Sequence, residues 1–300
     1  MQNKEKIGTL FILIHAVMWG IFPVLVNHGV KNIPPLTYAA LTILLATIGA
    51  FFYALIQGKL SDLKNKNSYK SLLMITLCIV IIPYSLFFWG ASLTSGVNTS
   101  VLLLSEIIFT LIFTHFIGEK TTGYKLMGAG GVFFGALFIL YNGTLNFNIG
   151  DLIIIISTIT YPIGNLYAKR VLNLVSPSII LFTRFLLGGL FILGLALLIE
   201  PQANIGQIIN NHWLLIVFNG LVLLGIGKVI WYEGLKRIDI SKAISLSSTF
   251  PLFSLIILLT IFKESISLYQ GIGIIIMMLG VYFSVKRKSV DPQLTKYANK

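Results

Sequence analysis

The sequence predicts an all-α integral membrane protein, with ten transmembrane helices arranged as two inverted five-helix repeats. Hydrophobic residues make up 56% of the chain and charged residues only 11%, whereas soluble domains carry about 25% charged residues. Apolar stretches of spanning length recur along the whole chain. Residues 89–138 also align with residues 234–283 without a gap, at a constant offset of 145. Composition, span length and repeat therefore predict the same fold class.

The ten apolar stretches follow one another with short polar loops between them. Most approach the ~20 residues that a helix needs to cross a bilayer core, and a helix satisfies its own backbone hydrogen bonds in lipid. The first stretch is interpreted as a span, because it is too long for a signal peptide and lacks a small-residue cleavage site. The expected spans are 7–28, 36–57, 71–91, 97–118, 124–141, 150–170, 178–199, 212–234, 243–262 and 268–286.

The repeat divides the chain into an N-terminal half, 1–143, a C-terminal half, 148–286, and a polar tail, 287–300. Aligned identical pairs include Ser100 and Ser245, Glu119 and Glu264, Gly128 and Gly273, and Gly135 and Gly280. Each half holds five spans. Since five is odd, the second half enters the membrane from the opposite side, and such inverted repeats are typical of transporters.

The basic residues predict the orientation. With the N-terminus inside, only Lys31 and Lys263 of the 22 Lys and Arg residues lie in outer loops, and Arg184 and Lys228 lie within spans. The other 18 (22 less these four) lie in inner segments, so both termini are expected in the cytoplasm. The protein is expected in the inner membrane of a prokaryote. The basic residues are spread over many short loops, which argues against nucleic-acid binding. The basic residues of 286–288 are expected to contact anionic membrane lipids.

Glu106 is the strongest single candidate for function. It lies in the middle of span 4, and Thr99, Glu106 and Thr110 share one helical face. An ionisable side chain at membrane depth usually faces a cavity or a partner. Glu106 is expected to bind a substrate ammonium or a coupling proton. A buried structural carboxylate is the alternative.

Aromatic and polar side chains recur in the middle of other spans. His15 and Trp19 lie one turn apart in span 1, and Tyr161 and Asn165 repeat that spacing in span 6, where Pro162 interrupts the hydrogen-bond ladder. The same lining is predicted to include Tyr84 and Trp89 of span 3 and Ser245 and Thr249 of span 9. Hydroxyl residues in spans often serve only helix packing, so the argument rests on the recurrence in both halves, near the midplane where transporter sites lie.

The remaining charged residues within spans receive different interpretations. Lys228 lies toward the cytoplasmic end of span 8, but deeper than Glu233, and is expected to meet Glu106 or a substrate anion. Snorkelling to the inner interface is the alternative for Lys228. Arg184 and Glu233 are interpreted as side chains that snorkel to the inner interface. Gly131 and Gly135 form a GxxxG face, which predicts close packing of span 5 against span 10.

Several of these residues carry a family resemblance. The pieces are Trp19-Gly20, Arg184-Phe185-Leu186-Leu187 and a half-ending pattern of Pro251, Phe262-Lys263-Glu264, Tyr269, Gly273 and Gly280. Over residues 7–286 the chain resembles the EamA-type branch of the drug/metabolite transporter superfamily. The resemblance implies two inverted five-helix repeats, alternating access and a central cavity lined by spans 1, 3, 4, 6, 8 and 9. This chain departs from the family in having Glu106 where proline is common in span 4, and Thr42 where arginine is common in span 2.

The predicted function is a secondary transporter of a small polar metabolite, of the amino acid or amine-like class. The alternatives are a passive channel and a membrane-embedded enzyme or scaffold. The enzyme is disfavoured, because the sequence has no HExxH motif, no paired carboxylates and no nucleophile with an adjacent base. No catalytic residue, cofactor or metal is expected. The predicted substrate-binding residues are His15, Trp19, Tyr84, Trp89, Glu106, Tyr161, Asn165, Lys228, Ser245 and Thr249.

Overall fold

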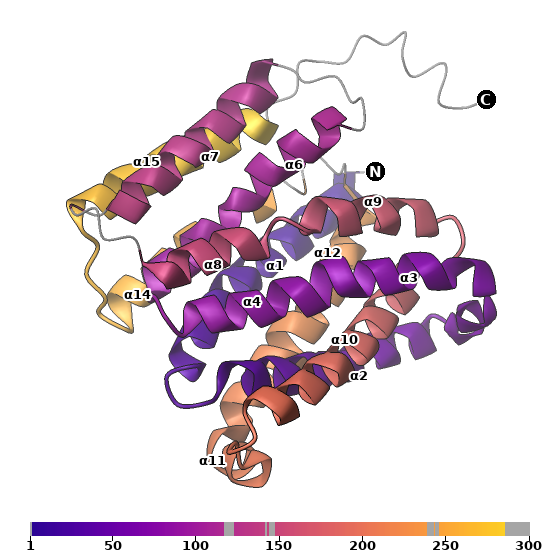
Figure 1. Cartoon of the computed structure of the whole chain (residues 1–300). Coiled ribbons are helices and arrows are strands. Elements are labelled where there is room, and N and C mark those ends of the chain that lie inside the picture. Colours follow the sequence, from indigo (N-terminus) through magenta and orange to yellow (C-terminus); the bar gives the residue numbers. More distant parts are fainter. Residues whose placement is uncertain are drawn as a thin grey trace, which may run out of the picture.

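The computed structural model describes residues 2–116, 123–141, 143, 148–238, 243 and 246–285. Within these ranges every regular element is a helix (Figure 1). Spans 1, 2, 5, 7 and 10 are continuous helices, namely α1 (Gln2–Gly29), α2 (Pro35–Ile56), α7 (Gly123–Tyr141), α10 (Pro177–Ile199) and α15 (Leu268–Val285).

The other spans are interrupted. Span 3 consists of α3 (Tyr69–Ile75), the π turn η3 (Thr76–Ile81) and α4 (Ile82–Ala91). Span 4 consists of α5 (Gly96–Val101), the 3₁₀ turn η4 (Leu102–Ser105) and α6 (Glu106–Phe116). Span 6 divides into α8 (Ile149–Ser157) and α9 (Tyr161–Val171). Span 8 consists of α11 (Ile205–Val217), the π turn η5 (Phe218–Ile226) and α12 (Gly227–Leu235), and in span 9 the helix α14 covers Phe250–Thr260. The 3₁₀ turns η1 (Leu60–Lys64) and η2 (Lys66–Ser68) precede span 3.

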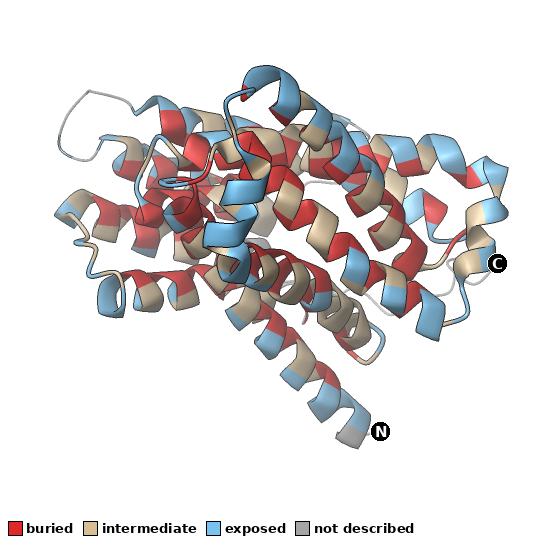
Figure 2. Cartoon of the chain, turned by 90° about the horizontal axis from the view of Figure 1, so that it is seen from below, coloured by how far each residue is buried: buried red, intermediate tan, exposed pale blue. Residues whose placement is uncertain are grey.

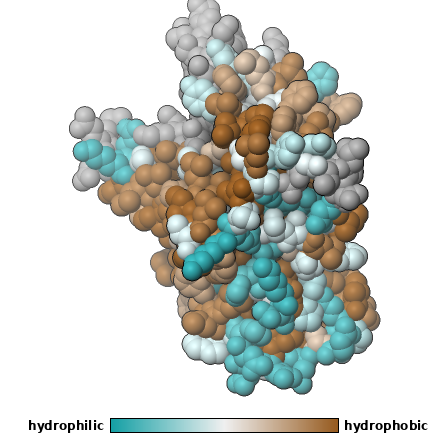
Figure 3. All heavy atoms as spheres, turned by 90° about the vertical axis from the view of Figure 1, so that its left-hand side faces the viewer, coloured by the Kyte–Doolittle hydropathy of each residue, from teal (hydrophilic) through white to brown (hydrophobic). Residues whose placement is uncertain are grey.

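The helices have the dimensions and surface of a membrane protein. In the described part of the chain, eight helical stretches are long and apolar enough to cross a membrane, and Phe250–Thr260 and Leu268–Phe283 are shorter apolar helices. Buried residues line the inner helix faces, whereas outward faces are exposed (Figure 2). Many exposed side chains are large and apolar, including Phe116, Leu198 and Leu268 at 82%, 79% and 76% exposure. Apolar residues cover much of the face in Figure 3, and hydrophilic residues gather at its lower end. Soluble monomers rarely expose so much apolar surface, so lipid is the expected surrounding.

Helices α2 and α10 pack side by side in opposite directions. Glu200, directly after α10, accepts hydrogen bonds from the backbone N–H groups of Leu36 (2.9 Å) and Thr37 (2.8 Å) at the start of α2. Asp62, in the loop after α2, accepts one from the N–H of Ser176 (2.8 Å), directly before α10. Each helix therefore has its free N-terminal donors capped by a carboxylate that follows the other helix.

Glycines bring α7 and α15 together, as the GxxxG face predicts, and the two helices lie side by side in Figure 1. A Cβ atom on Gly135 would lie 2.6 Å from the carbonyl oxygen of Gly273, and one on Gly280 would lie 2.7 Å from that of Gly128. The repeat alignment pairs Gly135 with Gly280 and Gly128 with Gly273. The two contacts are therefore the same contact with the two halves exchanged. The predicted packing of span 5 against span 10 is confirmed.

The helix interruptions have identifiable causes. Pro162 cannot continue the hydrogen-bond ladder, and its ring conflicts with the carbonyl of Thr158; helix geometry is lost at 158–160. The Thr160 hydroxyl donates to the backbone oxygen of Cys78 in the π turn η3 (2.8 Å), which satisfies part of the neighbouring irregular backbone. Irregular backbone at membrane depth is tolerated only where protein buries it or where it lines a cavity. The interrupted spans therefore mark the interior where a site can form.

Candidate functional site

Five residues from four spans form the central cluster, defined here as His15, Trp19, Glu106, Asn165 and Lys228. His15 and Trp19 lie on the continuous helix α1. The other three lie at or near the interruptions, since Glu106 is the first residue of α6, Lys228 is the second of α12, and Asn165 is one turn into α9.

Lys228 is held on one side of the cluster by aromatic rings. Its Nζ lies 3.5 Å from the centroid of the Trp19 ring, in cation–π geometry. His15 stacks on Trp19 with ring centroids 6.1 Å apart and packs against Trp231 at 5.1 Å. The Nδ1 atom of His15 lies 3.0 Å from the backbone oxygen of Gly227, so this nitrogen carries the proton that it donates. His15 thereby positions the residue that precedes Lys228.

Glu106 and Asn165 occupy the other side of the cluster. The side-chain amide of Asn165 donates to Oε1 of Glu106 at 3.3 Å, Asn165 is exposed, and Glu106 is partly exposed. Glu106 and Lys228 interact electrostatically but form no direct ion pair within the described ranges. Opposite charges that face a common space without neutralising each other can bind a ligand that carries both.

An aromatic wall adjoins the cluster. Trp19 stacks on Phe22 at 5.2 Å, and Phe22 meets Tyr84 edge-to-face at 6.1 Å. Phe250, at the start of α14, contacts Trp19 at 6.4 Å. Tyr161 is an electrostatic neighbour of both Tyr84 and Glu106. The structure thus brings Trp19, Tyr84 and Tyr161 toward one region, and it adds Phe22, which the sequence interpretation missed.

Three further candidate residues lie elsewhere or outside the described residues. Trp89 is 53% exposed and makes no ring contact with Trp19 or Tyr84 among the contacts described. Trp89 lies five positions after Tyr84, an offset that turns the two side chains to different faces of a helix. The structure does not place Trp89 with the cluster. Thr249 is partly buried and donates to the backbone oxygen of Leu246 (2.7 Å) in the turn before α14. Ser245 lies outside the described residues, as does Glu119 of the repeat alignment.

Arg184 is a central residue that the sequence interpretation placed wrongly. A snorkelling arginine would expose its guanidinium, but Arg184 is only 8% exposed. It is an electrostatic neighbour of Tyr84, Tyr161 and Lys228. Its position two turns into span 7 was the only sign of burial in the sequence. Arg184 is buried by tertiary contacts with other spans, which the sequence of span 7 alone does not reveal.

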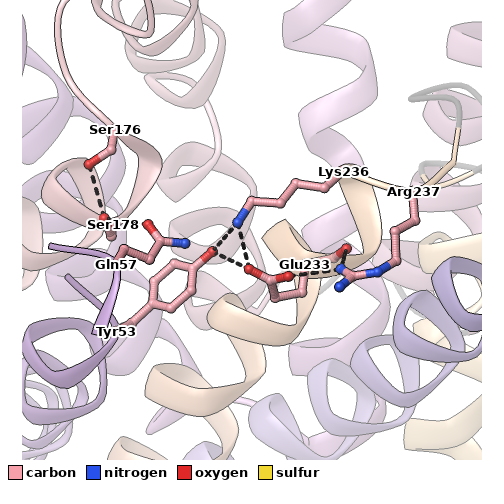
Figure 4. A network of polar contacts seen from close by, with 7 residues as sticks. All are labelled: Tyr53, Gln57, Ser176, Ser178, Glu233, Lys236 and Arg237. Carbon is pink, nitrogen blue, oxygen red and sulfur yellow. Dashed lines mark hydrogen bonds and ion pairs between the residues drawn. The ribbon is translucent and has the colours of Figure 1, made fainter. Parts of the chain in front are cut away.

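Glu233 lies in a polar network at the end of α12 (Figure 4). Its carboxylate accepts hydrogen bonds from Tyr53 (2.7 Å), Lys236 (2.6 Å) and Arg237 (2.8 Å), which ties α2 to the end of α12. Burial alone would lower the pKa of Lys236, but its hydrogen bonds to Glu233 and Tyr53 outweigh this effect and raise that pKa. Close by, Ser178 donates to Gln57 (3.0 Å), so a second bond ties α10 to the end of α2.

A second buried network, which we call the Asp151 network, lies at the opposite ends of the helices. Asp151 in α8 is 2% exposed and accepts hydrogen bonds from the hydroxyl of Thr94 (2.5 Å) and the amide of Asn98 (2.9 Å). Gln270 in α15 donates to the side-chain oxygen of Asn98 (2.9 Å). Nearby, the amide of Asn27 donates to the backbone oxygens of Ala91 and Thr94. These bonds join α1, α4, α5, α8 and α15.

These features define an all-helical, multi-pass membrane protein with interrupted helices around a polar and aromatic centre. Residues 6–141 and again residues 148–286 match the EamA-like transporter family, and the chain belongs to that family.

Relatives agree with this assignment. The chain is 25% identical over 289 residues to the uncharacterized transporter YoaV of Bacillus subtilis, covering 94% of this chain and 98% of the relative. It is 23% identical over 298 residues to a protein of Escherichia coli named "Probable amino-acid metabolite efflux pump", covering 94% and 95%. A protein crystal structure of the same fold aligns with a TM-score of 0.66 and 18% identity, over 95% of this chain and 98% of that one.

Proposed function

We propose that this protein is a secondary transporter that moves a small polar metabolite, of the amino acid or amine-like class, across a prokaryotic inner membrane by alternating access. One observation carries the proposal: Lys228, held on the Trp19 ring, and Glu106, hydrogen-bonded to Asn165, are electrostatic neighbours that form no direct ion pair within the described ranges. Unpaired opposite charges at membrane depth are costly unless they serve binding. The name of the E. coli relative supports the amino-acid class.

We infer further that residues 1–143 and 148–286 are inverted repeats. Two sets of contacts support this. Glu200 caps α2 and Asp62 caps α10, and the glycine contacts between α7 and α15 recur with the halves exchanged. Such exchange is expected when a two-fold axis in the membrane plane relates the halves.

We also infer which end of the bundle is open. At the end that the basic residues place outside, the Asp151 network joins the three helices α5, α8 and α15. At the other end, α9 packs mainly on α3 and α6, whereas α12 packs mainly on α1. Asn165 on α9 is exposed. These contacts support a state that is closed outside and open toward the cytoplasm, one of the two states that alternating access requires.

The test is counterflow in proteoliposomes with radiolabelled amino acids and amines. A carrier preloaded with unlabelled substrate accelerates uptake of the label, a passive channel does not, and an enzyme releases an altered product. Glu106→Gln keeps the shape of the side chain and removes its charge, so counterflow should fall at least tenfold or lose its pH dependence. Glu5→Gln, a matched change far from the cluster, should retain counterflow. Unchanged counterflow and pH profile in Glu106→Gln would remove Glu106 from the site.

A further inference from the structure

Arg184 is a buried arginine that lacks an acceptor. Its Nε atom is inaccessible and has no hydrogen-bond partner, and no ion pair or hydrogen bond to the guanidinium occurs within the described part of the chain. Its close described contact is the ring of Phe185, with Cζ 4.9 Å from the centroid. A guanidinium carries five N–H donors, and an unpaired buried charge is strongly destabilising. The guanidinium of Arg184 can therefore donate hydrogen bonds to an acceptor that the described part of the chain does not supply.

The neighbours of Arg184 are those of the central cluster. One turn further along α10, a Cβ atom on Gly188 would lie 2.5 Å from Cγ1 of Val80, so α10 packs tightly on the π turn of span 3. Tyr84 follows Val80 by one turn. Arg184 is an electrostatic neighbour of Tyr84, Tyr161 and Lys228, and of these Lys228 carries the second positive charge.

We propose that Arg184 and Lys228 form a carboxylate-binding subsite, so that the transported metabolite carries a carboxylate group. Lys228 has two charged neighbours, Arg184 and Glu106, whereas Lys228 is the charged neighbour of Glu106. The two cations therefore exceed the one carboxylate, and the excess positive charge favours an anionic group. The planar guanidinium matches a carboxylate in bidentate geometry. On the other side of the cluster, Glu106 and Asn165 accept and donate hydrogen bonds and receive the substrate ammonium.

This subsite rests on the proposed transport function and narrows its substrate class. An α-amino acid or a related amino-acid metabolite carries both groups, with the carboxylate toward Arg184 and Lys228 and the ammonium toward Glu106. An amine without a carboxylate leaves the two cations unsatisfied. The subsite therefore selects amino acids and their carboxylate-bearing derivatives over the corresponding decarboxylated amines.

Thermal unfolding of the purified full chain tests the subsite without a transport assay. The probes are the L-amino acids, their decarboxylated amines and sodium propionate, with sodium chloride and sodium phosphate at equal ionic strength as references. At about ten times its Kd, a bound ligand should raise the Tm by ~2 °C or more. At least one carboxylate should exceed chloride and phosphate, and its matched amine should not.

Variants separate binding from folding. Arg184→Gln should abolish the carboxylate-induced shift and, because it removes an unpaired buried charge, should raise the Tm of the ligand-free protein. Arg184→Lys keeps the charge but loses the planar fork, so the carboxylate Kd should rise about tenfold. Arg170→Gln, an exposed arginine at the end of α9, should leave both quantities unchanged.

Several outcomes would overturn the subsite. One is a carboxylate shift no greater than that of chloride. Another is an Arg184→Gln protein with a lower ligand-free Tm and an intact shift, which would make Arg184 a structural residue. Equal stabilisation by phosphate would indicate an inorganic-anion site. Counterflow of an amino acid that Arg184→Gln leaves unchanged would overturn the subsite while the transport function stands.

Discussion

At the scale of single residues, the cation–π contact between Lys228 and Trp19 organises the centre of the molecule. Such contacts contribute about 0.5–2 kcal/mol. Trp19→Leu should therefore weaken substrate affinity by roughly 3- to 30-fold while the Tm falls only slightly. Substrate titration of counterflow measures the first quantity and thermal unfolding the second.

The matched control is Trp213→Leu, because Trp213 on α11 is 56% exposed and lies away from the cluster. It should change neither quantity. Loss of activity in Trp19→Leu that only follows loss of folded protein would make Trp19 a packing residue.

The sequence predicted part of this centre for physical reasons that apply to other spans. Charged side chains within a span must avoid lipid, so Glu106 and Lys228 were expected to turn inward. Trp19 was expected there because its spacing from His15 recurs at Tyr161 and Asn165 in the second half. Trp89 was grouped with Tyr84 by its place in the span, although five residues of helix turn the two apart. The burial of Arg184 depends on how α10 packs on span 3, which no local pattern of span 7 records.

At the scale of helices, the glycine contact between α7 and α15 gives a clear stability prediction. A Cβ atom on Gly135 would lie 2.3 Å from the side chain of Met277 and 2.6 Å from the backbone of Gly273. Gly135→Ala should separate the helices and destabilise the fold by about 1–3 kcal/mol. Gly130→Ala is the matched control on the same helix, because nothing lies within 4 Å of its added Cβ. Thermal unfolding of both variants measures the difference, and equal Tm values would contradict the packing described.

The break at Pro162 gives a second prediction at this scale. Pro162→Ala allows the backbone of α8 to continue into α9, which would turn Asn165 relative to Glu106. Counterflow should fall several-fold although the Tm stays level or rises. Pro201→Ala in the loop after α10 is the control. A variant with normal counterflow would show that the break is not required for the site.

Helix positions were easier to predict than helix irregularities. Hydropathy placed the continuous spans within a few residues of α2, α7 and α10. Proline marked the break in span 6. The 3₁₀ turn Leu102–Ser105 contains no proline or glycine, and it ends where Glu106 aligns with Pro251, the second residue of α14. Spans 4 and 9 are thus interrupted at corresponding places in the two halves. Only the second half has a proline, Pro251, that signals the interruption in the sequence.

At the scale of the whole molecule, the charge distribution predicts the orientation in the membrane. Cysteines replacing Ser61 and Gln202, both exposed, should react with impermeant reagents from opposite sides in a Cys78→Ala background. Ser61→Cys should label only from the cytoplasmic side, and Gln202→Cys only from outside. Labelling of Ser61→Cys on intact cells would reverse the orientation.

The reciprocal glycine contacts have a consequence for the ancestry of the chain. Gly128 meets Gly280, and Gly135 meets Gly273. In the repeat alignment, Gly273 corresponds to Gly128 and Gly280 corresponds to Gly135, so the second contact is the first with the two halves exchanged. On our proposal that the two halves are inverted repeats, the surface of either half is complementary to an upside-down copy of itself. The same proposal implies a single ancestral half that inserted in both orientations and assembled as an antiparallel homodimer, before duplication and fusion made one polypeptide. Fusion then freed the two copies to diverge, and a carboxylate at position 106 opposite a proline at 251 is a difference that no homodimer could carry.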